Sequence, residues 1–187
     1  MNLAKFRINI LIILCQVMVL IGLALKGHFD YVHNVLITAG IWLIYMFLEA
    51  RYKLYMNNFV RVAVGITILS DSFFGFYLDM YLRSPGFDRI LHIFGIYSLS
   101  LFTYILVVQF LENTLSRLFK FIFVLCLGIS IGVVNEIMEF LSDTLSHLPI
   151  PNQIGLLDTD LDLLSNVIGA FYAAIHATYW NFVNRNF

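Results

Sequence analysis

The chain has 187 residues, of which 60% are hydrophobic and only 12% charged, and its formal net charge is −1. A soluble domain carries about 25% charged residues, so this composition excludes an ordinary water-soluble enzyme, a disordered chain and a nucleic-acid-binding protein. Since a membrane-spanning helix needs roughly 20 mostly apolar residues, the length accommodates about six such helices.

Apolar segments follow one another along the chain, at about residues 8–25, 31–48, 59–81, 90–111, 118–141 and 163–182. The first is expected to be a membrane helix rather than a signal peptide, because it is long and no small-residue cleavage site follows it. The connection 142–162 contains Pro149, Pro151 and Gly155, which predict a loop or a re-entrant turn. We therefore expect an all-α integral membrane protein, with residues 1–187 forming a single domain of six transmembrane helices.

The distribution of charge predicts the orientation of this bundle. If the N-terminus is cytoplasmic, eight of the eleven basic residues fall on the cytoplasmic side, namely Lys5, Arg7, Arg51, Lys53, Arg61, Arg117, Lys120 and Arg185. Positive charge in short loops marks the cytoplasmic side, so both termini are expected there. Ten of the twelve acidic residues fall on the opposite side, which predicts a site that faces outward.

Polar residues recur at helical spacing in the second half of the chain. Asp88 and His92, Glu136 and Glu139, and Asp162 and Asn166 each lie on one face of their helix. Ionisable residues within a membrane usually face the bundle interior or a water-filled cavity, so we expect these three pairs to converge. A stripe of Asp71, Gly75 and Asp79 is expected to join them, and Gly128, Gly132 and Gly169 predict close helix packing.

Three chemistries fit carboxylates around one imidazole. Glu136, Glu139 and Asp162 are candidate ligands of a divalent metal ion, since carboxylates suit Mg²⁺, Ca²⁺ or Mn²⁺. Asp88, His92 and Glu136 are candidate catalytic groups for general acid–base chemistry at a lipid head group. The same groups could instead relay protons in a transporter. Arg89, a candidate phosphate partner or counter-ion, and Asn166 are the expected substrate-binding residues.

The polar residues of three consecutive helices resemble those of a known family. Phe87-Asp88-Arg89-Ile90-Leu91-His92, then Glu136 with Glu139, then Asp162, Asn166 and Gly169 resemble the ordered motifs of VanZ-like membrane proteins, over about residues 87–173. Glu139 replaces the glutamine of typical VanZ proteins, and together with the preceding helices it makes the chain more similar to YjdF-type members. VanZ is associated with teicoplanin resistance. The resemblance implies a multi-pass protein of the bacterial cytoplasmic membrane, but it supplies no reaction.

These observations together predict a cell-envelope protein with an outward-facing carboxylate–histidine pocket. We expect it to bind or modify a polar lipid or a lipid-linked cell-wall precursor, with assistance from a divalent metal, and to have membrane lipids as its partners. A small proton- or ion-coupled transporter and a non-catalytic membrane interaction protein are the alternatives. The half of the predicted bundle nearer the cytoplasm offers few polar residues beyond Glu49, Gln109 and His176. This favours a one-sided pocket over a transport path.

Overall fold

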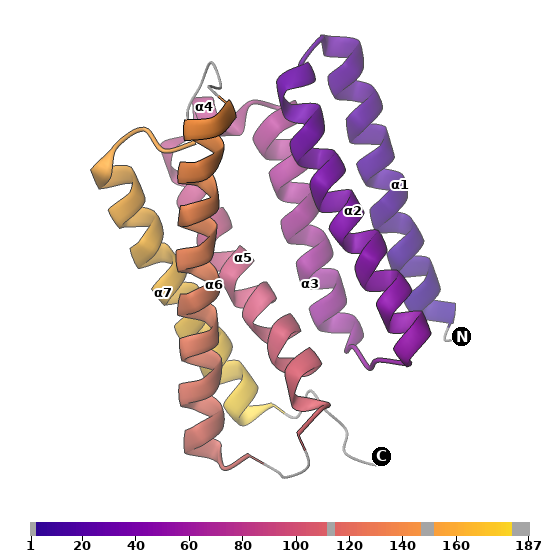
Figure 1. The fold of residues 1–187 in the computed structure, drawn as a ribbon, viewed down its shortest axis with the longest axis vertical. Helices are drawn as coiled ribbons and strands as arrows, with labels where there is room; N and C mark the ends of the chain where they lie inside the picture. The colour runs from indigo at the N-terminus through magenta and orange to yellow at the C-terminus, as the bar shows by residue number, and fades with distance from the viewer. Residues whose placement is uncertain (1–2, 112–114, 147–151, 181–187) are drawn as a thin grey trace. The chain divides into compact units, whose positions relative to one another are not determined.

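The computed structural model describes residues 3–111, 115–146 and 152–180, and these residues form helices and connections with no strand among them (Figure 1). The prediction of an all-α protein is confirmed. The chain divides into two compact units, Met1–Phe87 and Asp88–Phe187. This division falls at the beginning of the segment that resembles VanZ-like proteins, and each unit is described separately below.

The first unit is built on three long helical segments. Its elements are α1 (Leu3–Lys26), α2 (Phe29–Tyr52), α3 (Asn58–Leu69), a π-helix η1 (Ser70–Tyr77) and the short α4 (Met80–Arg83). Asn57 caps α3, because its side-chain oxygen accepts a hydrogen bond from the backbone nitrogen of Phe59 at 2.8 Å. The apolar core of the unit gathers around Leu23, Val35 and Phe76.

A buried charge network joins α1, α2 and α3. Arg61 and Glu49 are 0% and 1% exposed, and the Arg61 guanidinium donates to both carboxylate oxygens of Glu49 at 2.5 and 2.9 Å. The Lys5 ammonium lies 2.8 Å from Oε1 of Glu49, and Arg61 also donates to Oδ1 of Asn9 at 3.0 Å. The sequence analysis used Arg61 and Lys5 only as indicators of membrane topology. It did not predict the bidentate pair of Arg61 and Glu49.

The helix expected over residues 59–81 ends earlier than predicted, so Asp79 does not continue the stripe that begins with Asp71 and Gly75. The backbone changes at Ser70 to a π-helix, whose hydrogen bonds join residues five apart, and this helix ends at Tyr77, so Asp79 lies beyond it. Asp79 then adopts a left-handed conformation, with φ 58°, and precedes a separate short helix. Asp71 accepts a hydrogen bond from the Tyr81 hydroxyl at 2.6 Å, within the first unit.

The second unit contains most of α5 (Pro85–Val108), all of α6 (Arg117–Ser146) and all of α7 (Leu156–Tyr179). The expected close approach through glycine is confirmed. A Cβ atom added at Gly132 would lie 2.6 Å from Cβ of Asn166, and one added at Gly169 would lie 2.3 Å from the backbone oxygen of Ile93. Because α6 continues to Ser146 and α7 begins at Leu156, the connection is shorter than the predicted loop 142–162.

Several helical segments are long and apolar enough to span a bilayer. Among the described residues there are five, Leu3–Lys26, Phe29–Tyr52, Asn58–Tyr77, Gly86–Val108 and Arg117–Leu145. α7 is long enough to span a bilayer, but it is not one of these five segments. Its first two turns contain three acids, Asp158, Asp160 and Asp162. Six spans and cytoplasmic termini therefore stay predictions.

Candidate functional site

The polar pairs of α5, α6 and α7 lie together in the second unit. Six side chains form this group, hereafter the acid–histidine cluster: Asp88 and His92 from α5, Glu136 and Glu139 from α6, and Asp162 and Asn166 from α7. Each helix contributes two residues spaced three or four apart, as the sequence pattern indicated. The structure thus brings all six expected residues together, while their chemical roles stay predictions.

His92 lies at the centre of the cluster and is 8% exposed. Its Nε2 atom lies 3.4 Å from Oδ1 of Asp88 and 3.8 Å from Oε1 of Glu139. Its Nδ1 atom lies 3.0 Å from Oδ1 of Asn166 and 3.6 Å from Oε1 of Glu136. One imidazole therefore faces carboxylates from two helices, and this excess of negative charge favours an added cation or proton.

Asn166 fixes the orientation of the imidazole. Its amide nitrogen donates to Oε1 of Glu136 at 3.2 Å and to the backbone oxygen of Gly132 at 3.4 Å. The amide oxygen must then face His92, so the hydrogen-bond pattern assigns a proton to Nδ1 of the ring. In the neutral ring, Nε2 carries the lone pair and points toward Asp88.

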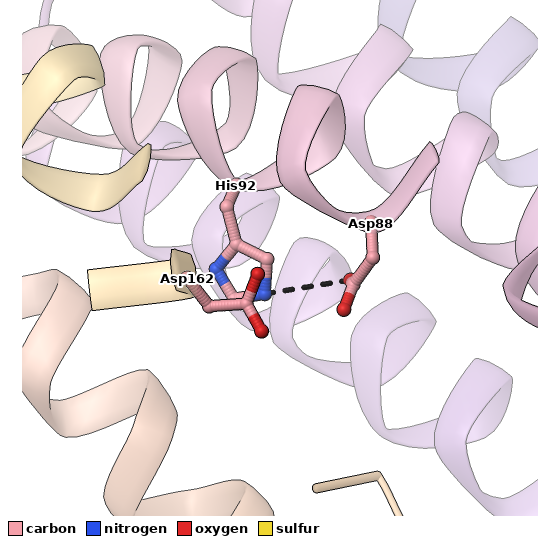
Figure 2. Close-up of side chains that lie close together, drawn as sticks. All are labelled: Asp88, His92 and Asp162. Carbon is pink, nitrogen blue, oxygen red and sulfur yellow. Dashed lines mark ion pairs between the residues drawn. The ribbon is translucent and has the colours of Figure 1, made fainter. Parts of the chain in front are cut away.

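Asp162 is the least satisfied carboxylate of the cluster. It is 2% exposed, and its Oδ1 atom has no hydrogen-bond partner among the described residues. One ligand atom each from Asp88, His92 and Asp162 lie within 4.8 Å of one another, and Figure 2 shows the three side chains side by side. Burial, reinforced by the nearby Asp88 carboxylate and opposed by His92, raises the pKa of Asp162 to about 6.

A second group of potential ligands shares the same histidine. One atom each from His92, Glu136 and Glu139 also lie within 4.8 Å of one another. The two glutamates are better supplied with hydrogen bonds than Asp162. Asn166 donates to Glu136 at 3.2 Å, and the Asn135 amide donates to Oε1 of Glu139 at 2.7 Å. Glu136 and Glu139 therefore each have an oxygen that accepts an amide hydrogen bond, whereas Oδ1 of Asp162 has no partner among the described residues.

The segment before α7 is tied to α6 beside the cluster. Asp143 accepts hydrogen bonds from the backbone nitrogens of Asn152 and Gln153 at 2.8 and 2.9 Å. The Gln153 side chain then donates to the backbone oxygen of Glu136 at 3.0 Å and lies 3.4 Å from its Oε2. Sequence reasoning missed Gln153, because its position depends on the path of a loop and not on helical spacing.

Arg89 forms an ion pair with an acid outside the cluster, and its expected role at a phosphate stays a prediction. Its guanidinium lies 3.4 Å from Oδ1 of Asp158, which joins α5 to α7. The same carboxylate group accepts a hydrogen bond from the backbone nitrogen of Ile154 at 3.2 Å, as an acid near a helix start does. Arg89 therefore lies next to the cluster in sequence but has Asp158 as its acidic partner.

An apolar groove of about 750 Å³ runs along α5 and α7. It is lined by Ile90, Ile93, Phe94, Tyr97, Tyr172, Ile175, His176, Tyr179 and Trp180. Two of its polar atoms are paired with each other, since the Tyr97 hydroxyl lies 2.5 Å from Nδ1 of His176. Helical spacing puts Ile90 and Phe94 on the side of α5 opposite Asp88 and His92. The same two helices thus carry polar residues on one side and an apolar groove on another.

Comparison with known proteins supports a membrane location. Residues 6–182 match the family described as predicted membrane protein (DUF2238). No curated protein matches the chain, and no solved structure matches it. The matched family does not carry the VanZ name, so the likeness of residues 87–173 to VanZ-like proteins stays a resemblance.

Proposed function

The chain belongs to this family of predicted membrane proteins, and from that premise we propose that it binds or modifies the head group of a polar lipid or a lipid-linked cell-wall precursor. One observation carries the proposal. α5 and α7 each bear residues of the acid–histidine cluster and residues of the apolar groove. An amphiphile presents a polar head and an apolar chain, and this unit offers a surface for each.

The groove suits the chain of such a ligand. Its lining is made of isoleucine and aromatic side chains, and within it the Tyr97 hydroxyl is paired with Nδ1 of His176. Binding sites for small ligands commonly have volumes of about 300–1,000 Å³, a range that includes this groove. Because the tail of a membrane lipid is already surrounded by hydrocarbon, its entry into the groove gains little hydrophobic free energy, so the groove positions the chain while head-group contacts supply the selectivity.

The cluster suits the head group and its chemistry. Asp88 and His92 provide a carboxylate and an imidazole 3.4 Å apart, an arrangement that supports general acid–base catalysis. Arg89 follows Asp88 and precedes Ile90, so it lies on α5 between the cluster side and the groove side. A guanidinium at that position suits a phosphate group. The outward orientation and the bacterial cytoplasmic membrane, both expected from the sequence, complete the proposal.

Trp180 in the groove gives a direct test. In a Trp42→Phe background, Trp180 is the single tryptophan, and lipids with brominated chains quench its fluorescence when they occupy the groove. We expect phosphate-bearing head groups to quench at a lower lipid fraction than uncharged glycolipid head groups with the same chains. Arg89→Gln should weaken this preference, whereas Arg83→Gln, at an arginine that is 70% exposed, should not.

Two results would contradict the proposal. Equal quenching by all head groups would mean that only surrounding bilayer lipid is sensed. Uptake of protons or ions into sealed vesicles, without any head-group preference, would favour the transporter alternative.

A further inference from the structure

We propose that Asp88, His92 and Asp162 bind a single divalent transition-metal ion, with Mn²⁺ and Zn²⁺ as the ions of best-matched chemistry. The inference deepens the proposed function, because it concerns the same acid–histidine cluster. It differs from the sequence expectation, which placed the ion on Glu136, Glu139 and Asp162. The reason lies in which of these oxygens already have hydrogen-bond partners.

Asp162 provides the first step of the argument. A carboxylate that is 2% exposed, with an Oδ1 atom unpartnered among the described residues, is costly unless a cation or a proton compensates it. Asp162 also has a carboxylate oxygen within 4.8 Å of a ligand atom of Asp88 and of a ligand atom of His92 (Figure 2). Glu136 and Glu139, by contrast, already accept hydrogen bonds from amides.

His92 provides the second step. Histidines that bind metals usually donate their other ring N–H group to an oxygen, which fixes the tautomer and the ring orientation. Here Nδ1 faces Oδ1 of Asn166 at 3.0 Å, and the Asn166 amide is itself held by Glu136 and Gly132. The ring is thus fixed with its Nε2 lone pair on the side of Asp88.

The distance between His92 and Asp88 provides the third step. Charge-assisted hydrogen bonds of this kind measure about 2.7–2.9 Å, whereas Nε2 of His92 and Oδ1 of Asp88 lie 3.4 Å apart. Two ligands that each lie about 2.1 Å from one tetrahedral ion are separated by about 3.4 Å. The pair is therefore spaced as ligands of a common ion are.

The ligand types select the ion. Two carboxylates balance the charge of a divalent cation, while the imidazole favours a transition metal over Mg²⁺ or Ca²⁺, which prefer oxygen ligands alone. Three protein ligands leave a coordination position for an oxygen of the head group. Glu136 and Glu139 then stay beside the ion, where a carboxylate can accept a proton.

Metal binding can be measured on the purified, tag-free full chain after treatment with a chelator. We expect Zn²⁺ or Mn²⁺ to bind at one ion per chain and to raise the melting temperature, with little effect from Mg²⁺ or Ca²⁺. Loss of a ligand's hydrogen-bond partner typically reduces metal affinity about 10- to 100-fold. We expect a larger loss, about 100-fold or more, when a ligand itself is replaced in Asp162→Asn or in Asp88→Asn. Asp160→Asn is the matched control, since Asp160 is an exposed acid on the same helix.

Glu139→Gln distinguishes the two groups of ligands and should keep the bound ion. Loss of the ion in Glu139→Gln but not in Asp162→Asn would overturn the assignment, as would a parent protein that binds none of the four ions. If Asp162→Asn fails to fold, Asp88→Asn takes its place in this comparison: loss of the ion in Glu139→Gln together with its retention in Asp88→Asn would overturn the assignment.

The metal-binding experiment and the lipid-quenching experiment can fail independently of each other. Head-group preference in the quenching assay without any bound ion would refute the metal site alone. One tightly bound ion without head-group preference would refute the lipid proposal alone.

Discussion

The side-chain oxygen of Asn166 lies 3.0 Å from Nδ1 of His92, and the nitrogen of the same amide lies 3.2 Å from Oε1 of Glu136. One side chain of α7 thus holds an imidazole of α5 and a carboxylate of α6. Because an amide has a donor end and an acceptor end, this arrangement sets the proton position on the ring as well as its direction.

Replacement of this amide should affect both stability and metal affinity. Asn166→Ala removes hydrogen bonds from two buried side chains, His92 and Glu136, which should reduce the free energy of unfolding by about 1–3 kcal/mol. The affinity for Zn²⁺ should fall about 10- to 100-fold, since His92 loses the group that orients it. Calorimetric titration and thermal unfolding test both effects. Asn135→Ala, at an exposed position of α6, should have a much smaller effect on each.

The stability of the metal-free protein should depend on the protonation of Asp162. The pKa of Asp162 is raised from 3.8 to about 6 in the folded protein, so between these values the folded state binds a proton more tightly than the unfolded state. The contribution of Asp162 to the free energy of unfolding therefore increases as the pH falls from about 7 to about 4. Melting temperatures across this range should show the increase in the parent and less of it in Asp162→Asn. A parent and variant with the same pH profile would contradict this.

The pairs Asp88–His92 and Asp162–Asn166 were predictable because regular α-helices place residues four apart on one face. The π-helix at Ser70–Tyr77 was not, since nothing in its residues distinguishes a π-helix from a continued α-helix. Burial of Arg61 could not be read from a rule that counts charges by side of the membrane. The assignment of ligands within the cluster depends on hydrogen bonds from Asn166 and Asn135, which spacing alone does not reveal.

The close contact between α7 and α5 should be sensitive to one methyl group. In Gly169→Ala the new Cβ would lie 2.3 Å from the backbone oxygen of Ile93, so one helix must move. We expect a loss of about 1–3 kcal/mol in the free energy of unfolding, measured in detergent by thermal or denaturant unfolding. Gly40→Ala is the control, since a Cβ there meets nothing within 4 Å. It should be neutral or stabilising by about 0.5–1 kcal/mol, because alanine favours a helix interior.

Cysteine labelling in intact cells tests the predicted orientation. In a background without Cys15 and Cys126, a reagent that cannot cross the membrane should label Asn152→Cys, because the segment before α7 is expected outside. Asn57→Cys, in the connection before α3, should react only after the cells are opened. The reverse pattern would place the acid–histidine cluster at the cytoplasmic side.

The buried pair of Arg61 and Glu49 bears on how the protein is inserted during synthesis. A lone arginine costs about 2.5–3.5 kcal/mol at the centre of a membrane helix on insertion scales and less near a helix end, where Arg61 lies in the first turn of α3, so an unpaired Arg61 disfavours entry of α3 only modestly. Glu49 lies in α2, separated from α3 by residues 53–57, so the compensating carboxylate arrives on the preceding helix. Lys5 and Asn9 are made earlier still and complete the set of partners. We therefore expect α2 and α3 to enter the membrane as a paired hairpin against α1, which keeps the guanidinium paired with Glu49.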